Sequence, residues 1–413
     1  MEHFKPTFCQ DPWKVPLDQI NVSAPDLFEN YTFWPYFERL RKEDPVHYCS
    51  QSENGPFWSV TKYSDIMYVD THHHIFSSAE GITLVDRDLN FNTNNFISMD
   101  PPRHDDQRKA VQGVVAPSNL ANLEGIIRER AGRILDELPL GETFNWVTEV
   151  SIELTTQMLA TLFDFPFEER YKLTHWSDIA TSRPELGGSV SKEDRERELL
   201  ACLEAFTHLW NERVNLEKPG NDLISMLAHN KSTRNMQPLE FLGNLILLIV
   251  GGNDTTRNSI TGGVIALNEN PGEYQKLRGN LELIPNMVSE IIRWQTPLAY
   301  MRRTALEDTE LRGKQIKKGD KVLMWYVSGN RDEEAIERPN EFIIDRANAR
   351  RHLSFGFGIH RCMGNRMAEM QLRVVWEEIM KRFHKVEVVG DPVRIRSNFI
   401  KGYSELLVRV HPV

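Results

Sequence analysis

The amino-acid sequence predicts a mainly α-helical fold with small β-sheets, in the α+β class, built as one compact domain over residues 1–413. Nearly every segment between about residues 118 and 268 has apolar residues at helical spacing, whereas both ends of the chain contain short extended runs. The chain has no internal repeat, low-complexity tract or obvious linker. These observations predict a helical block flanked by small sheets, with no division into separate units.

The amino-terminal part is expected to combine helix with a small sheet. Residues 1–44 form an extension and the first helix, whose helical pattern covers 34–42. Two short extended runs follow at 46–49 and 57–60, separated by a turn-rich stretch. These runs predict strands of one small sheet.

The middle of the chain predicts a series of long helices. Amphipathic stretches at 120–138, 150–163 and 194–216 are separated by Pro or Gly clusters. A further helix carries apolar residues at helical spacing and continues into the pair Gly251-Gly252.

After Arg303 the pattern returns to strands. Residues 309–316, with Arg312-Gly313 at the centre, predict a hairpin, and 321–327 predict a buried strand. A helix is expected at 365–383, and the alternation of Leu406, Val408 and Val410 predicts an extended tail.

Charge and composition exclude some functions. The 49 Lys and Arg against 59 Asp and Glu give a net charge of -10, which is the wrong sign for a chain that wraps nucleic acid through its whole surface. We expect no nucleic-acid partner.

The cysteines and the amino terminus predict a cytoplasmic protein. Cys9, Cys49, Cys202 and Cys362 are widely scattered, so they suggest neither a disulfide framework nor a zinc ribbon, and a reducing cytosol fits best. The first residues have no apolar signal region, and the longest aliphatic run, at 245–250, is too short to span a bilayer. We expect neither an export signal nor an integral membrane anchor.

The most informative motif surrounds Cys362. In this stretch Phe355, Gly358, His360, Cys362 and Gly364 lead directly into the helix expected at 365–383. A cysteine just before a helix start faces free backbone N–H groups and the positive end of the helix dipole, which favour a thiolate. A dinucleotide loop would need glycine directly before the cysteine, and a zinc site would need more sulfur nearby.

A second motif, Gly251-Gly-Asn-Asp254-Thr255-Thr, lies inside a predicted helix. Paired glycines there cost about 1 kcal/mol each relative to alanine, so close approach or distortion is expected. The Thr255 hydroxyl can reach back to the carbonyl of Gly251 and open the helix to water. This would make room for a ligand.

Together these motifs resemble those of the cytochrome P450 family. The resemblance implies haem b held between a long central helix and the cysteine loop, with the Cys362 thiolate as the axial iron ligand and the other residues of the cysteine motif binding the cofactor. It also implies that Asp254 and Thr255 deliver protons to dioxygen bound at the iron.

Two further segments match family positions. The resemblance implies that His104 and Arg108, in a D-P-P-x-H-x-x-x-R segment, and Arg303 bind the haem propionates. It also implies a structural ion group of Glu290, Arg293 and Arg346 that braces the cysteine loop. Glu290 and Arg293, three residues apart, would share one face of a helix.

The resemblance also implies how electrons arrive. Soluble bacterial members take them from NADH or NADPH through an FAD-dependent ferredoxin reductase and a ferredoxin. Residues 350–382 hold seven Lys or Arg against three Asp or Glu, which favours docking of an acidic electron-transfer protein, although a solvated face is the simpler alternative.

Within the family, the sequences around Thr255 and Cys362 are similar to those of bacterial alkane and fatty-acid terminal hydroxylases. We expect terminal hydroxylation of an apolar small molecule, medium-chain alkanes or fatty acids, to primary alcohols with O2. The alternatives are a hydroxylase of terpenes or other alicyclic compounds, a peroxygenase, and a non-catalytic haem sensor or carrier. By family position, the expected pocket residues are Ile82, Leu84, Val85, Leu248, Gly251, Leu298, Met301 and Phe399.

Overall fold

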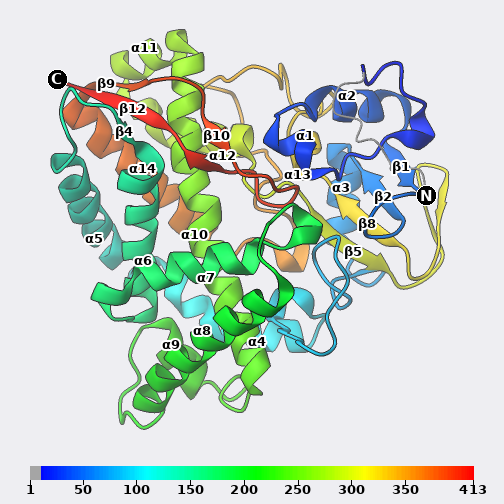
Figure 1. The fold of residues 1–413 in the computed structure, drawn as a ribbon, viewed down its shortest axis with the longest axis horizontal. Helices are drawn as coiled ribbons and strands as arrows, with labels where there is room; N and C mark the ends of the chain where they lie inside the picture. Colours follow the sequence, from blue (N-terminus) through cyan, green and yellow to red (C-terminus); the bar gives the residue numbers. More distant parts are fainter. Residues whose placement is uncertain (1–10) are drawn as a thin grey trace.

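The computed structural model describes residues 11–413. The long helices lie on one side of the molecule, and a five-stranded sheet lies on the other side together with helices α1 to α3 (Figure 1). The helices are α1 (Pro25–Glu29), α2 (Trp34–Glu43), α3 (Tyr63–Thr71), α4 (Arg103–Val111), α5 (Pro117–Asp136), α6 (Glu153–Phe163), α7 (Tyr171–Thr181), α8 (Lys192–Arg213), α9 (Leu223–His229), α10 (Pro238–Glu269), α11 (Pro271–Gly279), α12 (Ile284–Gln295), α13 (Tyr326–Gly329) and α14 (Asn365–Arg382). The strands are β1 (Val46–Cys49), β2 (Phe57–Val60), β3 (Phe76–Ser77), β4 (Phe144–Asn145), β5 (Met301–Ala305), β6 (Thr309–Leu311), β7 (Lys314–Ile316), β8 (Lys321–Met324), β9 (Phe383–Val388), β10 (Val393–Arg394), β11 (Tyr403–Glu405) and β12 (Leu407–Pro412).

The five-stranded sheet joins segments that are far apart in the sequence. Its order is β1-β2-β8-β5-β3, and all neighbours are antiparallel except β2 and β8, which pair in parallel with Trp58 opposite Val322. A second sheet, β4-β12-β9, brings the end of the chain against the middle. The first sheet therefore places residues near 300 beside the amino-terminal region.

Helix α10 is the centre of the molecule. It is 32 residues long and packs against α6, α7, α12 and α14. Because it has neighbours on several sides, apolar residues occur around most of its circumference. Its first half belongs to an apolar cluster with α5 to α9, and its second half to one with α12, α14, β9 and β12.

The predicted fold class is confirmed, and so are most elements. The strands at 46–49 and 57–60 have the predicted bounds, and the hairpin at 309–316 turns at Arg312 and Gly313, whose φ angles are both positive. The helices expected at 34–42, 120–138 and 194–216 differ from α2, α5 and α8 by a few residues at their ends.

Three details differ from the prediction. The buried strand expected at 321–327 ends at Met324. The Trp325 N–H still bonds to the Val60 carbonyl, but the next residues form helix α13. The helix expected at 150–163 begins with a π-helical segment, Val147–Ile152. An additional helix, α1, precedes α2. Cys9 and the first ten residues of the predicted extension lie outside the described residues.

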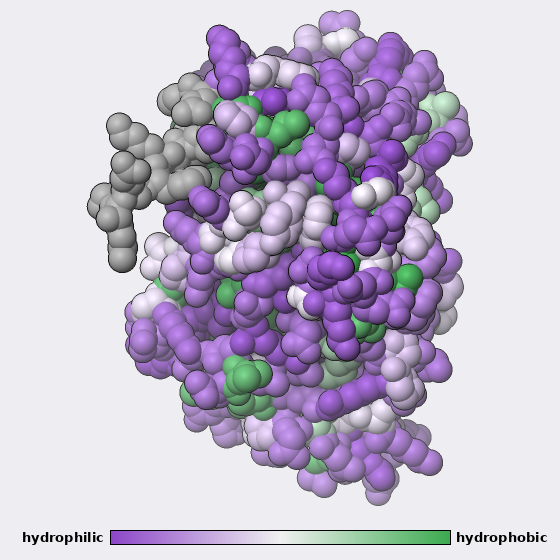
Figure 2. Space-filling view, turned by 90° about the vertical axis from the view of Figure 1, so that its right-hand side faces the viewer, coloured by the Kyte–Doolittle hydropathy of each residue, from purple (hydrophilic) through white to green (hydrophobic). Residues whose placement is uncertain are grey.

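The face that carries the five-stranded sheet is largely hydrophilic, with apolar residues scattered across it (Figure 2). Scattered apolar residues are ordinary on a protein surface. Within residues 11–413, no helix is long and apolar enough to cross a membrane.

Candidate active site

The predicted cysteine lies on a tight loop before α14. Gly356 and Gly358 have φ angles of 63° and 64°, and a Cβ on Gly358 would lie only 2.4 Å from the Asp70 carbonyl oxygen. The N–H of Cys362 donates to the carbonyl of Phe355 at 2.8 Å. The loop is thereby closed on itself, with Cys362 among the residues that line a large cavity.

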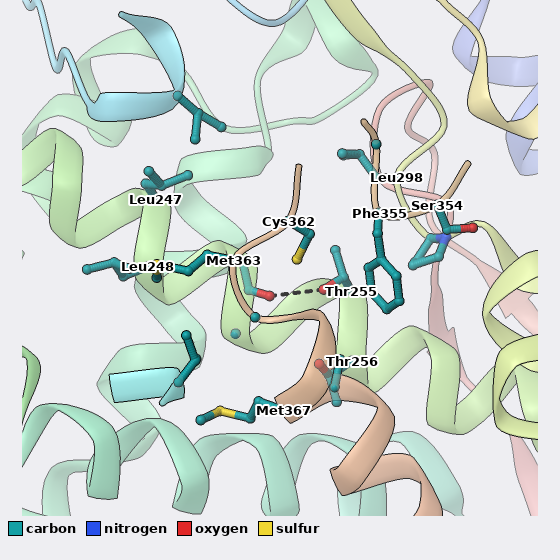
Figure 3. Close-up of a pocket in the computed structure, with 18 of the residues that line it drawn as sticks. Leu247, Leu248, Thr255, Thr256, Leu298, Ser354, Phe355, Cys362, Met363 and Met367 are labelled. Atoms are coloured by element: carbon teal, nitrogen blue, oxygen red, sulfur yellow. Dashed lines mark hydrogen bonds between the residues drawn. The ribbon is translucent and has the colours of Figure 1, made fainter. Parts of the chain in front are cut away.

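The cavity lies between the cysteine loop and helix α10. It contains about 1480 Å³ of space without protein atoms, including its opening to solvent. Figure 3 shows Cys362 on its loop and Thr255 on α10 both directed into this space. A molecule bound in this cavity can therefore contact both side chains.

The Cys362 thiol is suited to a metal. Burial raises its pKa, whereas the backbone N–H of Gly364 and the charges of Arg108 and Arg361 lower it, and the rise from burial is the larger effect. A metal cation at Sγ would reverse this balance, since metal coordination removes the thiol proton.

Buried nitrogen atoms beside the cysteine loop lack acceptors. Within the described residues, His104 Nε2 and both ring nitrogens of His360 are buried without a hydrogen-bond partner, and the two rings lie 4.4 Å apart. Arg108 and Arg303 line the cavity next to them. Burial and the neighbouring cations, chiefly Arg303, lower the pKa of His360 to about 2.

Such a group of donors needs an anion. Unpaired buried polar atoms are rare in folded proteins and costly, and carboxylate groups would satisfy them. Haem carries two propionates beside an iron that accepts thiolate. These residues therefore fit haem: the cysteine faces the cavity, where it would bind the iron, and four cationic or imidazole groups lie nearby for the propionates.

Helix α10 forms the wall across the cavity from the loop. The Thr255 hydroxyl donates to the Gly251 carbonyl at 3.0 Å, as the sequence suggested, while the helix continues through both residues (Figure 3). A Cβ on Gly251 would meet no atom within 4 Å, because this residue faces open space. The wall is thus open at Gly251 and presents the Thr255 hydroxyl to the cavity.

Asp254 points away from the cavity. Its side chain is fully buried, pairs with Arg257 at 2.8 Å and accepts a long hydrogen bond of 3.4 Å from the Thr181 hydroxyl on α7. Arg257 in turn donates to Asp178 at 2.5 Å, and the Asp178 side chain is about half exposed. Burial raises the pKa of Asp254, and Arg257 opposes this. A polar chain therefore runs from the surface to the residue beside Thr255.

The structure brings together the three residues of the ion group. Arg293 donates twice to the Glu290 carboxylate at 2.7 Å, and Arg346 Nε donates to it at 3.0 Å. All three are buried. Arg293 also donates to the Asn330 carbonyl, and the Asn330 side chain bonds to the N–H of Leu353 and the Ser354 hydroxyl. Through Asn330, the group is connected to the segment that begins the cysteine loop.

The predicted substrate residues separate into two groups. Ile82, Leu248, Gly251, Leu298 and Met301 line the cavity. Leu84, Val85 and Phe399 are not among its lining residues and instead belong to the amino-terminal apolar cluster with Phe28 and Trp325. Two hydrogen bonds explain this separation. The Arg302 N–H on β5 donates to the Ile82 carbonyl at 2.8 Å, and the Leu84 N–H donates to the Tyr300 hydroxyl oxygen at 3.0 Å. These bonds hold Leu84 and Val85 against the amino-terminal apolar cluster.

Several further residues that were not predicted from the sequence line the cavity, among them Phe96, Ile97, Leu247 and Pro297. Leu247 lies four residues before Gly251, so helical spacing alone could have identified it. Phe96 and Ile97 lie in a short 3₁₀ turn, Phe96–Ser98, where no periodic pattern marks the inward face.

Comparison with known proteins agrees with this geometry. A family model described as Cytochrome P450 matches residues 192–399. The linalool 8-monooxygenase of Pseudomonas putida is 35% identical over 96% of this chain and 100% of its own. The methyl-branched lipid omega-hydroxylase of Mycobacterium tuberculosis is 32% identical, covering 96% of each chain.

A solved structure is also similar. CYP153D17 from Sphingomonas sp. PAMC 26605 superposes with a TM-score of 0.91 at 46% identity, covering 96% of this chain and all of that one. The family's monooxygenases contain a haem iron, the cofactor that the cysteine loop and the unpaired nitrogens fit. The chain belongs to the cytochrome P450 family of monooxygenases.

Proposed function

We propose that this monooxygenase hydroxylates the terminal carbon of medium-chain alkanes or fatty acids, using haem b ligated by Cys362. The observation that carries the proposal is the distribution of charge in the cavity. Among its described lining residues, the only Arg or Lys side chains are Arg108 and Arg303, both beside His360. The lining contributed by Ile82, Leu247, Leu248, Leu298 and Met301 is apolar.

This distribution favours the alkane over the fatty acid. A buried carboxylate needs a cation or several donors. Arg108 and Arg303 would be occupied by the propionates, and Arg303 also donates to Asp70. A fatty acid would therefore have to keep its carboxylate at the cavity opening, whereas an alkane has no such requirement. A methyl end directed past Gly251 toward the iron would be selected by shape.

Terpenes remain the second candidate, because one relative is a linalool monooxygenase. Linalool is an open-chain terpene alcohol, so its oxidation is compatible with a cavity for linear chains. The other relative acts at the omega end of methyl-branched lipids. Both relatives support an apolar, chain-like substrate for this protein more than a compact ring.

Haem with a thiolate ligand supplies activation of dioxygen and insertion of one oxygen atom into a C–H bond. The chain's own contribution is proton delivery. Thr255 holds a hydroxyl at the cavity wall, and Asp254 lies next to it with its carboxylate on Arg257. For Asp254 to pass a proton toward Thr255, it must leave Arg257, while Asp178 holds the guanidinium. This arrangement argues against a sensor, which needs no proton route.

Electrons would come from NADH or NADPH through a ferredoxin reductase and a ferredoxin. Four of the seven basic residues at 350–382, namely Arg350, Arg373, Lys381 and Arg382, form ion pairs with nearby carboxylates. Arg361 and Arg366 are exposed on either side of Cys362. These two cations are the residues that we assign to docking of an acidic partner.

Product analysis with three ten-carbon compounds tests the substrate class. The haem-loaded enzyme, supplied with NADH, a surrogate ferredoxin and its reductase, is given decane, decanoate and limonene in equal amounts. We expect the primary alcohol of decane as the main product. Predominant limonene products would refute the terminal hydroxylase, and no substrate-dependent NADH consumption with any compound would favour the haem sensor.

A further inference from the structure

We propose that Asp70 is a positioning residue of the haem site, which fixes the cysteine loop and Arg303 in one arrangement. Asp70 lies in the last turn of α3 and is fully buried. A carboxylate is unfavourable both in the interior and at a helix C-terminus. A carboxylate at this position therefore needs hydrogen-bond donors or a cation that offset its unfavourable burial.

Three donors from three different elements provide that compensation. Arg303 on β5 donates to Asp70 Oδ1 at 2.7 Å, and the N–H of Phe357 in the cysteine loop donates to Oδ2 at 2.7 Å. The Tyr326 hydroxyl on α13 donates to Oδ2 at 3.2 Å. One carboxylate thus joins α3, β5, α13 and the loop that carries Cys362.

The backbone also shows how closely the loop fits against Asp70. A Cβ on Gly358 would clash with the Asp70 carbonyl, and one on Gly356 would lie 3.2 Å from its Oδ2. The loop therefore rests on Asp70 at two glycines as well as through the Phe357 N–H. Displacement of Asp70 would change the path of the loop four residues before the cysteine.

Asp70 also determines what Arg303 can offer to the cofactor. One terminal nitrogen of Arg303 is held by Asp70 and the other donates to the Arg302 carbonyl at 2.9 Å. A guanidinium has five N–H donors in a fixed plane, so the two anchored nitrogens set the direction of the remaining donors. Arg303 lines the cavity beside His360, and the inference rests on the proposed haem site there.

The test compares Asp70→Asn with the control Asp65→Asn. Asp65 is also buried on α3 and pairs with Arg312, but it does not contact the cysteine loop. The measurements are hemin affinity of the haem-free protein, the ferrous–CO spectrum and the ferric/ferrous potential of the loaded protein. The potential and spectrum report on the iron site, which a loss of stability alone would not move.

We expect Asp70→Asn to bind hemin at least roughly tenfold more weakly, since a charge-assisted hydrogen bond to a buried group is lost. Loss of the negative charge should also raise the potential by about 59 mV, a tenfold change in the ferric-to-ferrous ratio. Part of the ferrous–CO protein should lose the thiolate band. Asp65→Asn should retain the wild-type affinity, potential and spectrum.

The proposal would be overturned if Asp70→Asn had the hemin affinity, the potential and the ferrous–CO spectrum of the wild type. If Asp70→Asn does not fold, Tyr326→Phe decides, because it removes only the 3.2 Å hydrogen bond. The carboxylate then keeps its charge but loses one donor, so a fall in potential supports the proposal, and an unchanged potential overturns it. A wild-type protein that binds no hemin would instead refute the haem site itself.

Discussion

Replacing Glu290 by glutamine should destabilise the protein far more than the same change at an exposed ion pair. The Glu290 carboxylate accepts two hydrogen bonds from Arg293, one from Arg346 and one from the Ile343 N–H at 2.9 Å. Its side chain is fully buried. The glutamine would leave two buried guanidinium groups without their counter-charge.

Removing one partner of a buried ion pair costs about 3 to 5 kcal/mol. The entropy of unfolding near the midpoint is about 2.1 cal/mol/K per residue, or roughly 0.9 kcal/mol/K for a chain of this length. The thermal midpoint of Glu290→Gln should therefore fall by roughly 3 to 6 °C.

The control is Glu129→Gln on α5, whose partner is Arg133 and whose side chain is 68% exposed. Exposed pairs of this kind contribute little, so we expect a change below about 1 °C. Circular dichroism of both haem-loaded variants measures the difference. Midpoints within 1 °C of each other would refute the claim that the buried group braces the cysteine loop.

Three further predictions follow from the site. Thr255→Ala should keep haem and nearly all stability, since its hydroxyl bonds only to Gly251, but should divert NADH into peroxide; an unchanged ratio of product to NADH would contradict the proton route. Burial lowers the pKa of His352 to about 3, below the ordinary 6.5, so the unfolded chain gains a proton first as the pH falls. Below about pH 6.5 the free energy of unfolding should therefore fall by roughly 1.4 kcal/mol per pH unit. His352→Gln should reduce this dependence on pH, measured by urea unfolding at pH 7 and pH 5; the same dependence in both proteins would contradict this role of His352. Gly251→Leu should fold normally, because its side chain enters open space, yet weaken the spin-state response to decane; wild-type binding would show that substrate does not pass this residue.

Local signals predicted much of the fold. Short extended runs around a turn-rich stretch indicated β1 and β2, the Arg312-Gly313 turn indicated the hairpin, and apolar spacing indicated the long helices, because each of these signals depends on neighbouring residues. The end of β8 at Met324 was missed because the chain then enters α13, which packs against α2 and α3, far away in the sequence. Periodicity gives no information about such long-range contacts.

The functional site shows the same difference between local sequence signals and long-range contacts. Cys362 and Thr255, which belong to the motifs shared with the family, line the cavity, and Glu290 forms its buried ion group with Arg293. Asp70 and Phe96 belong to no local motif, and they reach the site only because the five-stranded sheet and the loops between helices fold over it. Leu84 does not line the cavity for the same reason, since its N–H bonds to the Tyr300 hydroxyl and its side chain packs in the amino-terminal apolar cluster.

The central claim is that Cys362 supplies a thiolate to haem iron in this cavity. The most direct test is the ferrous–CO difference spectrum of hemin-loaded wild type and of Cys362→Ser, each checked for haem content. We predict the red-shifted Soret band of thiolate ligation in the wild type and its loss in Cys362→Ser. Retention of that band without the sulfur, or its absence from a haem-replete wild type, would contradict the assignment.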